Sequence, residues 1–168
     1  MDLATIRAMD AADPLRDFRD RFDLPEGVIY LDGNSLGALP KVTAARIADV
    51  VAREWGQDLI RSWNRNHWIE APRRLGGKIA RLIGAQTHEV VAADSTSINV
   101  FKALSAAVQL RPNRSVILSE TGNFPTDAYM MQGLAALSGG RIEQKLLPAN
   151  DIPAALDETV AVLLLTQT

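Results

Sequence analysis

The sequence predicts an α/β fold with a three-layer, mostly parallel sheet and helices on both faces, and two observations support this prediction. From about residue 90 onward, short apolar runs of strand length alternate with segments of helical periodicity. The connections between these segments are short, which is typical of parallel strands joined by covering helices. Ligands bind such sheets beyond the carboxyl ends of the strands, so the loops at those ends are the first candidates for a functional site.

The composition is that of an ordinary globular protein and argues against several classes of function. Of 168 residues, 47% are hydrophobic and 23% are charged, and the net charge of −2 offers no basic surface for nucleic acid. No apolar run reaches the roughly 18 residues of a membrane span, and the N-terminus lacks a signal-peptide pattern, so we expect a cytoplasmic protein. The chain has no cysteine, and His67 and His88 lack metal-site spacing, so we expect no metal.

The first 55 residues are expected to form helices on either side of an irregular loop. The pattern predicts a helix over residues 3–23, a short strand over 28–31 and a helix from Pro40 to Trp55. The residues of this last helix that are expected to face inward are Ile47, Val50, Val51 and Trp55. Residues 32–37 contain two glycines and an asparagine, which indicates either an ordinary loop or a backbone that approaches another group closely.

The three tryptophans lie within fourteen residues of one another, which is unusual in a chain with 5% aromatic residues. They are Trp55, Trp63 and Trp68, and they indicate either core packing or the wall of a pocket or interface. The segment 60–64 lacks clear periodicity and is expected to be irregular. A helix is predicted over 72–83, with Leu75, Ile79, Leu82 and Ile83 on one face and Gly84 as its C-terminal cap.

Residues 90–106 combine a short apolar run, a polar turn and a helical pattern. Val90–Ala93 are long enough for a buried strand, Asp94–Ser97 are small and polar, and a helix is predicted from about Ile98. The first N–H groups of a helix lack partners within it, and the helix dipole is positive there. Hydroxyls at such a junction are typical of an ordinary helix cap and also of a phosphate site, and both interpretations stay open.

The rest of the chain continues the alternation of strands and helices. Strands are expected over 115–118, 141–147 and 160–166, a helix near 126–137 and a short helix over 151–156. The loop 120–127 and the turn 94–97 both follow predicted strands, so both are expected at the ligand-binding edge. The chain contains neither a GxGxxG nor a GxxxxGK[ST] motif, which argues against a dinucleotide or P-loop enzyme.

Four motifs, in matching order and spacing, resemble those of the kynureninases. They are Tyr30–Gly37 (YLDGNSLG) followed by Pro40, Ile60–Asn64 (IRSWN), Asp94–Lys102 (DSTSINVFK) and Asn123–Asp127 (NFPTD). The resemblance implies a pyridoxal 5'-phosphate (PLP) enzyme of the aspartate-aminotransferase-like fold (fold type I), usually a homodimer. It implies the hydrolysis of L-kynurenine or 3-hydroxykynurenine to anthranilate or 3-hydroxyanthranilate and L-alanine, a step of tryptophan catabolism in the kynurenine pathway that leads to NAD.

The same resemblance implies roles for individual residues. Thr96 and Ser97 would hold the cofactor phosphate, and the segment Phe124–Asp127 would contact the ring. Within that segment Phe124 would stack on the ring, Asp127 would lie beside it, and Pro125 and Thr126 would complete the contact. Asn34, Ser35 and Trp63 would lie near the substrate. An aromatic stacking surface and a carboxylate beside the pyridine suit the electron-withdrawing role of this cofactor.

The resemblance also implies that much of the active site is missing from this sequence. PLP chemistry needs a lysine that forms a Schiff base, and none of Lys41, Lys78, Lys102 and Lys145 matches the family's motif. Because the lysine is expected beyond Thr168 and the sequence stops within an apparent strand, we expect the truncated N-terminal portion of a longer enzyme. Residues 1–60 would be an N-terminal segment with part of the small domain and dimer contacts, and residues 61–168 the first part of the large PLP-binding domain. These 168 residues alone are expected to be inactive.

Two other interpretations remain open. The chain could belong to another fold-type-I PLP enzyme, similar to cysteine desulfurases or epimerases, but those families usually carry a histidine where this chain has Phe124. It could also be a non-enzymatic binding protein that keeps the fold.

Overall fold

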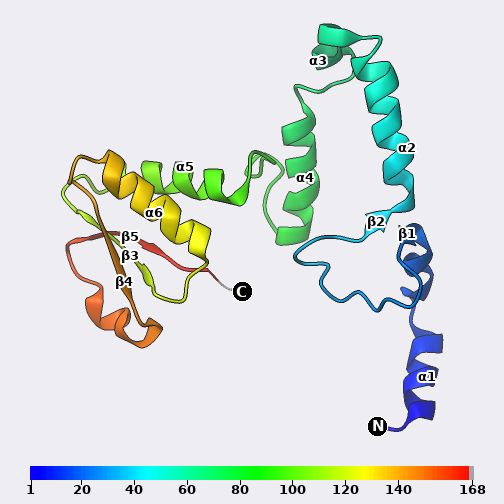
Figure 1. Cartoon of the computed structure of the whole chain (residues 1–168), viewed down its shortest axis with the longest axis horizontal. Helices are drawn as coiled ribbons and strands as arrows, with labels where there is room; N and C mark the ends of the chain where they lie inside the picture. Colours follow the sequence, from blue (N-terminus) through cyan, green and yellow to red (C-terminus); the bar gives the residue numbers. More distant parts are fainter. Residues whose placement is uncertain (167–168) are drawn as a thin grey trace. The chain divides into compact units, whose positions relative to one another are not determined.

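The computed structural model describes residues 1–166, which belong to two compact units, Met1–Ala71 and Pro72–Thr168 (Figure 1). Each unit is described by itself. The expected division of the enzyme into segments 1–60 and 61–168 stays a prediction. The last two residues of the strand-like C-terminal sequence, Gln167 and Thr168, lie outside the described residues.

The unit of residues 1–71 is built from short helices and one small pair of strands. Its elements are α1 (Leu3–Ala12), a 3-10 helix (Arg16–Arg21), β1 (Phe22–Asp23), β2 (Leu39–Pro40), α2 (Lys41–Asp49), a π-helix (Val50–Trp55), a 3-10 helix (Leu59–Arg61) and α3 (Ser62–Arg65). The Asp2 carboxylate caps α1 by accepting a hydrogen bond from the Thr5 backbone N–H at 2.8 Å. β1 and β2 pair antiparallel.

Several expectations for these residues were wrong in detail. The helix predicted over 3–23 ends at Ala12, because Pro14 disfavours a helical conformation for Asp13, whose backbone is extended. Residues 28–31 form no strand, and the local pairing is made by β1 and β2 instead. The helix after Pro40 is confirmed, but Ile47, Val51 and Trp55 are 58%, 50% and 64% exposed rather than facing a core.

The second unit contains the predicted parallel sheet, which confirms the α/β fold class. Its elements are α4 (Ala71–Ile83, which begins at the last residue of the first unit), α5 (Thr96–Gln109), β3 (Val116–Glu120), α6 (Pro125–Leu137), β4 (Glu143–Leu147), 3-10 helices (Ala149–Asp151 and Pro153–Ala155) and β5 (Val160–Leu164). The described strands run in the order β4-β3-β5, and β3 is parallel to both neighbours.

Apolar side chains cover both faces of this sheet. On one face, Ile117 of β3 packs in a cluster with Leu104 and Val108 of α5 and Met131 of α6. On the other face, Val116, Leu118 and Val160 pack with Ile152, which lies between the two short 3-10 helices. The sheet is therefore the middle layer, and α5 and α6 lie side by side over one of its faces (Figure 1).

The strand predicted over Val90–Ala93 is absent, and these residues form an irregular segment next to α4. A Cβ atom at Gly76 would lie 2.1 Å from the Val90 carbonyl oxygen, so only glycine allows this approach. The Ala92 N–H donates to the Pro72 carbonyl at 3.1 Å. The Ala92 N–H, which would bond to a neighbouring strand if these residues formed one, is thus bonded to the first turn of α4 instead. Gly84 has a φ of 73° and ends α4, as predicted.

Candidate functional site

The N-terminus of α5 has the geometry predicted for a helix cap. Ser95 is the N-cap, and its hydroxyl accepts a hydrogen bond from the Ile98 N–H at 3.4 Å. Thr96 and Ser97 are therefore the first two residues of the helix, and within the described chain their hydroxyls have no hydrogen-bond partner. The first-turn N–H groups and two uncommitted hydroxyls leave this helix end suited to an anion.

The turn before α5 is held in an unusual conformation. Asp94 has a φ of 45°, in the left-handed region that few non-glycine residues adopt. Its carboxylate forms an ion pair with Lys102, which lies in the second turn of α5. The Asn99 side chain donates to the Ala93 carbonyl at 2.7 Å, which fixes the other side of the turn. These contacts orient the backbone that enters the helix.

The loop between β3 and α6 is fixed by a chain of buried hydrogen bonds. The Ser119 hydroxyl donates to the Leu164 carbonyl of β5 at 2.7 Å and accepts from the Asn123 amide at 2.7 Å. The Asn123 side-chain oxygen in turn accepts from the Phe124 N–H at 2.6 Å. The start of α6 is thereby attached to the carboxyl ends of two strands.

The segment Phe124–Asp127 presents two different kinds of surface. Phe124 is the N-cap of α6 and is 54% exposed, so it is not a core residue in this chain. Pro125 is the first helical residue, a position that tolerates the missing N–H. Asp127 is only 5% exposed, and its carboxylate accepts a hydrogen bond from the Thr166 hydroxyl at 2.9 Å. Within residues 1–166, no arginine, lysine or histidine forms an ion pair with Asp127.

The expected cofactor residues lie at one edge of the sheet. α6 begins directly after β3, and α5 runs back toward the start of β3, so both helices begin at the carboxyl ends of the strands (Figure 1). This edge therefore carries the N-termini of both helices with the hydroxyls of Thr96 and Ser97. It also carries the exposed ring of Phe124 and the buried carboxylate of Asp127. Such a set can bind a flat molecule that carries an anionic group at one end and a cationic group at the other.

The expected substrate residues belong to the first unit. Asn34 and Ser35 lie in an exposed loop, where the Ser35 hydroxyl donates to the Asp32 carboxylate at 2.8 Å. The Tyr30 hydroxyl donates to the Leu36 carbonyl at 2.5 Å and thereby closes this loop. Trp63 lies in α3 and is 48% exposed. Its ring meets that of Trp68 edge-on, with centroids 6.4 Å apart and an interplanar angle of 75°.

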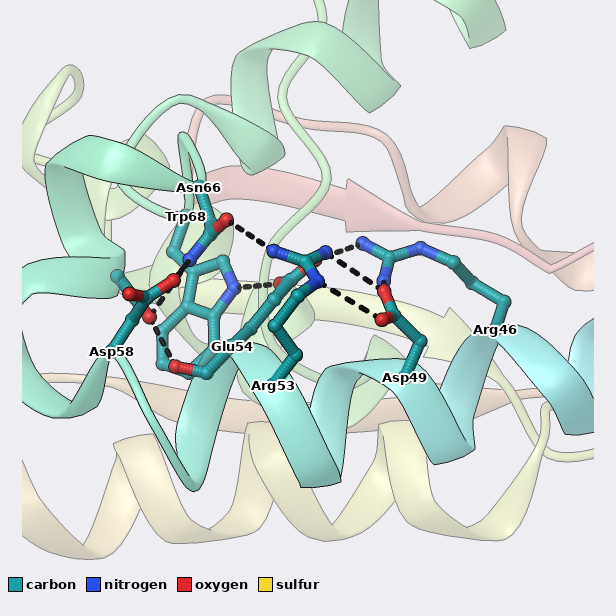
Figure 2. Close-up of polar contacts among 8 residues, drawn as sticks. Arg46, Asp49, Arg53, Glu54, Asp58, Asn66 and Trp68 are labelled. Atoms are coloured by element: carbon teal, nitrogen blue, oxygen red, sulfur yellow. Dashed lines mark hydrogen bonds and ion pairs between the residues drawn. The ribbon is translucent and has the colours of Figure 1, made fainter.

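A polar cluster that the sequence analysis missed holds the segment around Trp63. This Glu54 network consists of Arg46, Asp49, Arg53, Glu54, Asp58, Ser62, Asn66 and Trp68 (Figure 2). Glu54 is 3% exposed, and its carboxylate accepts from the Trp68 indole N–H and from Arg46, both at 2.6 Å. The alternating arginines and carboxylates of the helix were a visible signal, but nothing in the sequence showed that Trp68 would reach Glu54.

The hydrogen bonds of this network lower the pKa values of its carboxyl groups. The pKa of Glu54 lies below its ordinary value because of the hydrogen bond from Trp68, with a further contribution from Arg46. The pKa of Asp58 is lowered by the hydrogen bond from Asn66 and the charge of Arg65, and that of Asp49 by the hydrogen bond from Arg53. The charged forms are thus the ones that the fold favours.

Comparison with known proteins identifies the class to which these features belong. No family model matches the chain. The chain is 50% identical to the kynureninase of Deinococcus radiodurans over 99% of its own length, and 50% and 51% identical to those of Pseudomonas fluorescens and Burkholderia mallei over 95%. It spans about two fifths of the length of these curated relatives, that is 42%, 39% and 39%.

The α/β unit is accordingly part of a PLP-dependent transferase-like fold (fold type I). The similarity to kynureninases extends over nearly the whole length of the chain, which confirms the resemblance seen in its motifs. Among the described residues, no helix is long and apolar enough to cross a membrane. In the same residues, histidine, aspartate and glutamate side chains form no cluster suited to a metal ion.

Proposed function

We propose that this chain is part of a kynureninase that uses PLP to hydrolyse L-kynurenine or 3-hydroxykynurenine to L-alanine and anthranilate or 3-hydroxyanthranilate. The observation that carries the proposal is the identity of about half of all positions with kynureninases over 95–99% of the chain. A homodimer in the cytoplasm, and a place in tryptophan catabolism leading to NAD, are parts of the same proposal.

The residues at the carboxyl edge of the sheet suit PLP. Its phosphate is a dianion, and the first turn of α5 offers unpaired N–H groups with the hydroxyls of Thr96 and Ser97. The exposed ring of Phe124 offers a stacking surface next to Pro125 and Thr126. Asp127 is a buried carboxylate without a cationic partner in the described chain, so a protonated pyridine nitrogen would complete its interactions.

These assignments give each residue a defined task. When bound, PLP withdraws electrons from the substrate carbons attached to it. Asp127 would keep the proton on the ring nitrogen, and Thr166 orients Asp127 through its hydroxyl. Thr96 and Ser97 would anchor the phosphate, and Asn34, Ser35 and Trp63 would bind the substrate. The lysine that binds the cofactor covalently would be supplied from beyond Thr168, so the 168 residues alone would show no turnover.

The test is a PLP titration of the full-length protein, followed by addition of L-kynurenine and detection of anthranilate. We expect saturable absorbance of bound cofactor and release of anthranilate. Phe124→Ala should weaken PLP binding about two- to tenfold through the loss of the stacking surface. The matched control Phe18→Ala removes another exposed ring, 45% exposed against 54% for Phe124, and should leave PLP binding unchanged. Bound PLP without anthranilate would assign a different fold-type-I reaction, and absence of PLP binding would favour a non-enzymatic protein.

A further inference from the structure

We propose that Glu54 is a positioning residue that sets the affinity for the aromatic half of the substrate, acting through Trp68 on Trp63. The inference rests on the proposed function, in which Trp63 binds substrate, and it assigns a role to a buried acid outside the cofactor-binding residues.

The first step of the argument is the burial of charge. Within residues 1–71, all of them described, the buried side chains are Glu54, Asp58 and Ser62. Burying a carboxylate is unfavourable unless hydrogen bonds and opposite charges compensate it. Glu54 receives both, from Arg46 at 2.6 Å, from Arg53 at 3.2 Å and from the Trp68 N–H at 2.6 Å. Its position is therefore fixed from three directions.

The second step is the coupling of the two indole rings. The Glu54–Trp68 hydrogen bond fixes the direction in which the Trp68 ring points (Figure 2). The edge of one ring then faces the other, which is a favoured aromatic geometry. Trp63 keeps 48% of its surface exposed, so it has a free aromatic face after this contact is made. A flat aromatic ligand on that face would depend on the tilt that Trp68 imposes.

The third step is the strained backbone on either side of Trp63. Leu59 and His67 have φ values of 49° and 57°, both in the left-handed region, although neither is glycine. Such conformations persist only where neighbouring contacts hold them, and they are concentrated at functional sites. The contacts that hold this segment come from Asp58, whose carboxylate accepts from Asn66 at 2.9 Å and from Arg65 at 2.8 Å. A π-helix, another feature frequent at functional sites, carries Glu54 itself.

The experiment uses the full-length enzyme with Glu54→Gln, Trp68→Phe and the double variant. Anthranilate represents the aromatic half of the substrate and L-alanine the amino-acid half, and the binding of each is measured by competition. We expect both single variants to weaken anthranilate binding about two- to tenfold, the range of a lost aromatic contact, with L-alanine and PLP binding unchanged. Glu54→Gln removes the charge that Arg46 and Arg53 hold in place, and Trp68→Phe removes the indole N–H that Glu54 accepts. The double variant should weaken anthranilate binding no further, because both substitutions weaken the same connection.

Two matched controls separate positioning from general damage. Glu26→Gln neutralises an exposed acid of the same unit, and Trp55→Phe changes an exposed indole, and both should bind anthranilate as the parent does. Equal losses for anthranilate, L-alanine and PLP would reveal a merely structural role and overturn the inference, as would normal anthranilate binding in both single variants. Should Glu54→Gln fail to fold, Trp68→Phe alone decides the question. If the parent enzyme neither binds PLP nor releases anthranilate, the proposed function fails instead.

Discussion

In residues 1–71 every buried side chain is polar and belongs to the Glu54 network, whereas residues 72–166 bury mainly apolar side chains around β3. The second unit resembles a conventional small domain, in which burial of apolar surface supplies most of the stability. The first unit instead exposes many of its large apolar residues and is held by directional bonds between charged groups. The geometry of the first unit therefore depends on a few hydrogen-bonding atoms. That of the second unit depends on the shape and volume of the packed apolar side chains.

The largest contrast is expected when the same residue type is truncated in the two units. Ile117 is fully buried between the helices and the sheet, whereas Ile47 is 58% exposed on α2. Ile117→Ala should lower the free energy of unfolding by about 2–5 kcal/mol, and Ile47→Ala should change it by no more than about 0.5 kcal/mol. Urea denaturation followed by circular dichroism measures both. Similar costs for the two variants would show that the first unit has an apolar core after all.

A smaller effect is expected at the buried hydrogen-bond chain that joins Asn123, Ser119 and Leu164 in the second unit. Ser119→Ala removes the hydroxyl that joins Asn123 to the Leu164 carbonyl, and it leaves one buried and one partly buried group without that partner. We expect a loss of about 1–3 kcal/mol in urea denaturation. Ser115→Ala, at an exposed serine just before β3, is the matched control. If both variants unfold alike, ordered water has replaced the Ser119 hydroxyl and the loop is held by other contacts.

The smallest effect, and the one that separates the units most clearly, is a pH dependence. The folded-state pKa of Glu54 lies below its ordinary value of 4.5, so its contribution is fully present above pH 4.5 and lost as pH falls through the lowered value. All three tryptophans lie in the first unit, so their fluorescence reports its unfolding alone. Acidification below pH 4.5 should therefore change the tryptophan signal, and Glu54→Gln should make that change shallower. An identical acid profile in both proteins would assign it to Asp49 and Asp58 instead.

Much of the fold of the second unit could be predicted, because the spacing of apolar residues along the sequence indicates which face of a helix or strand is buried. β3, α6, β4 and β5 were all expected near their observed positions. The residue types of the polar turn Asp94–Ser97 allowed a helix cap to be predicted there, and Ser95 is that cap. The strand expected at Val90–Ala93 failed because an apolar run fits equally well against a helix, and the absence of a side chain at Gly76 made α4 the partner. Pairing partners distant in the chain leave no trace in local sequence.

The candidate site divides in the same way. Thr96, Ser97 and Phe124–Asp127 could be proposed because their motifs lie next to helix starts, and the structure locates those starts at one edge of the sheet. The Glu54 network could not be proposed, because its side chains connect Arg46 to Trp68, which lies 22 positions further along the chain. Charged residues on a helix are usually solvated, so their types alone gave no reason to expect a buried acid.

The order β4-β3-β5 leaves two outer strands with different chemistry. β4 has the sequence EQKLL and carries Glu143 and Lys145, whereas β5 has the sequence VAVLL and carries no charge. Charged residues on an outer strand discourage pairing with foreign chains, and an uncharged apolar strand invites it. Of the two edges, the one formed by β5 is therefore the one suited to receive another strand. When the chain is purified by itself, aggregation should start at that edge, and a lysine introduced there should delay it.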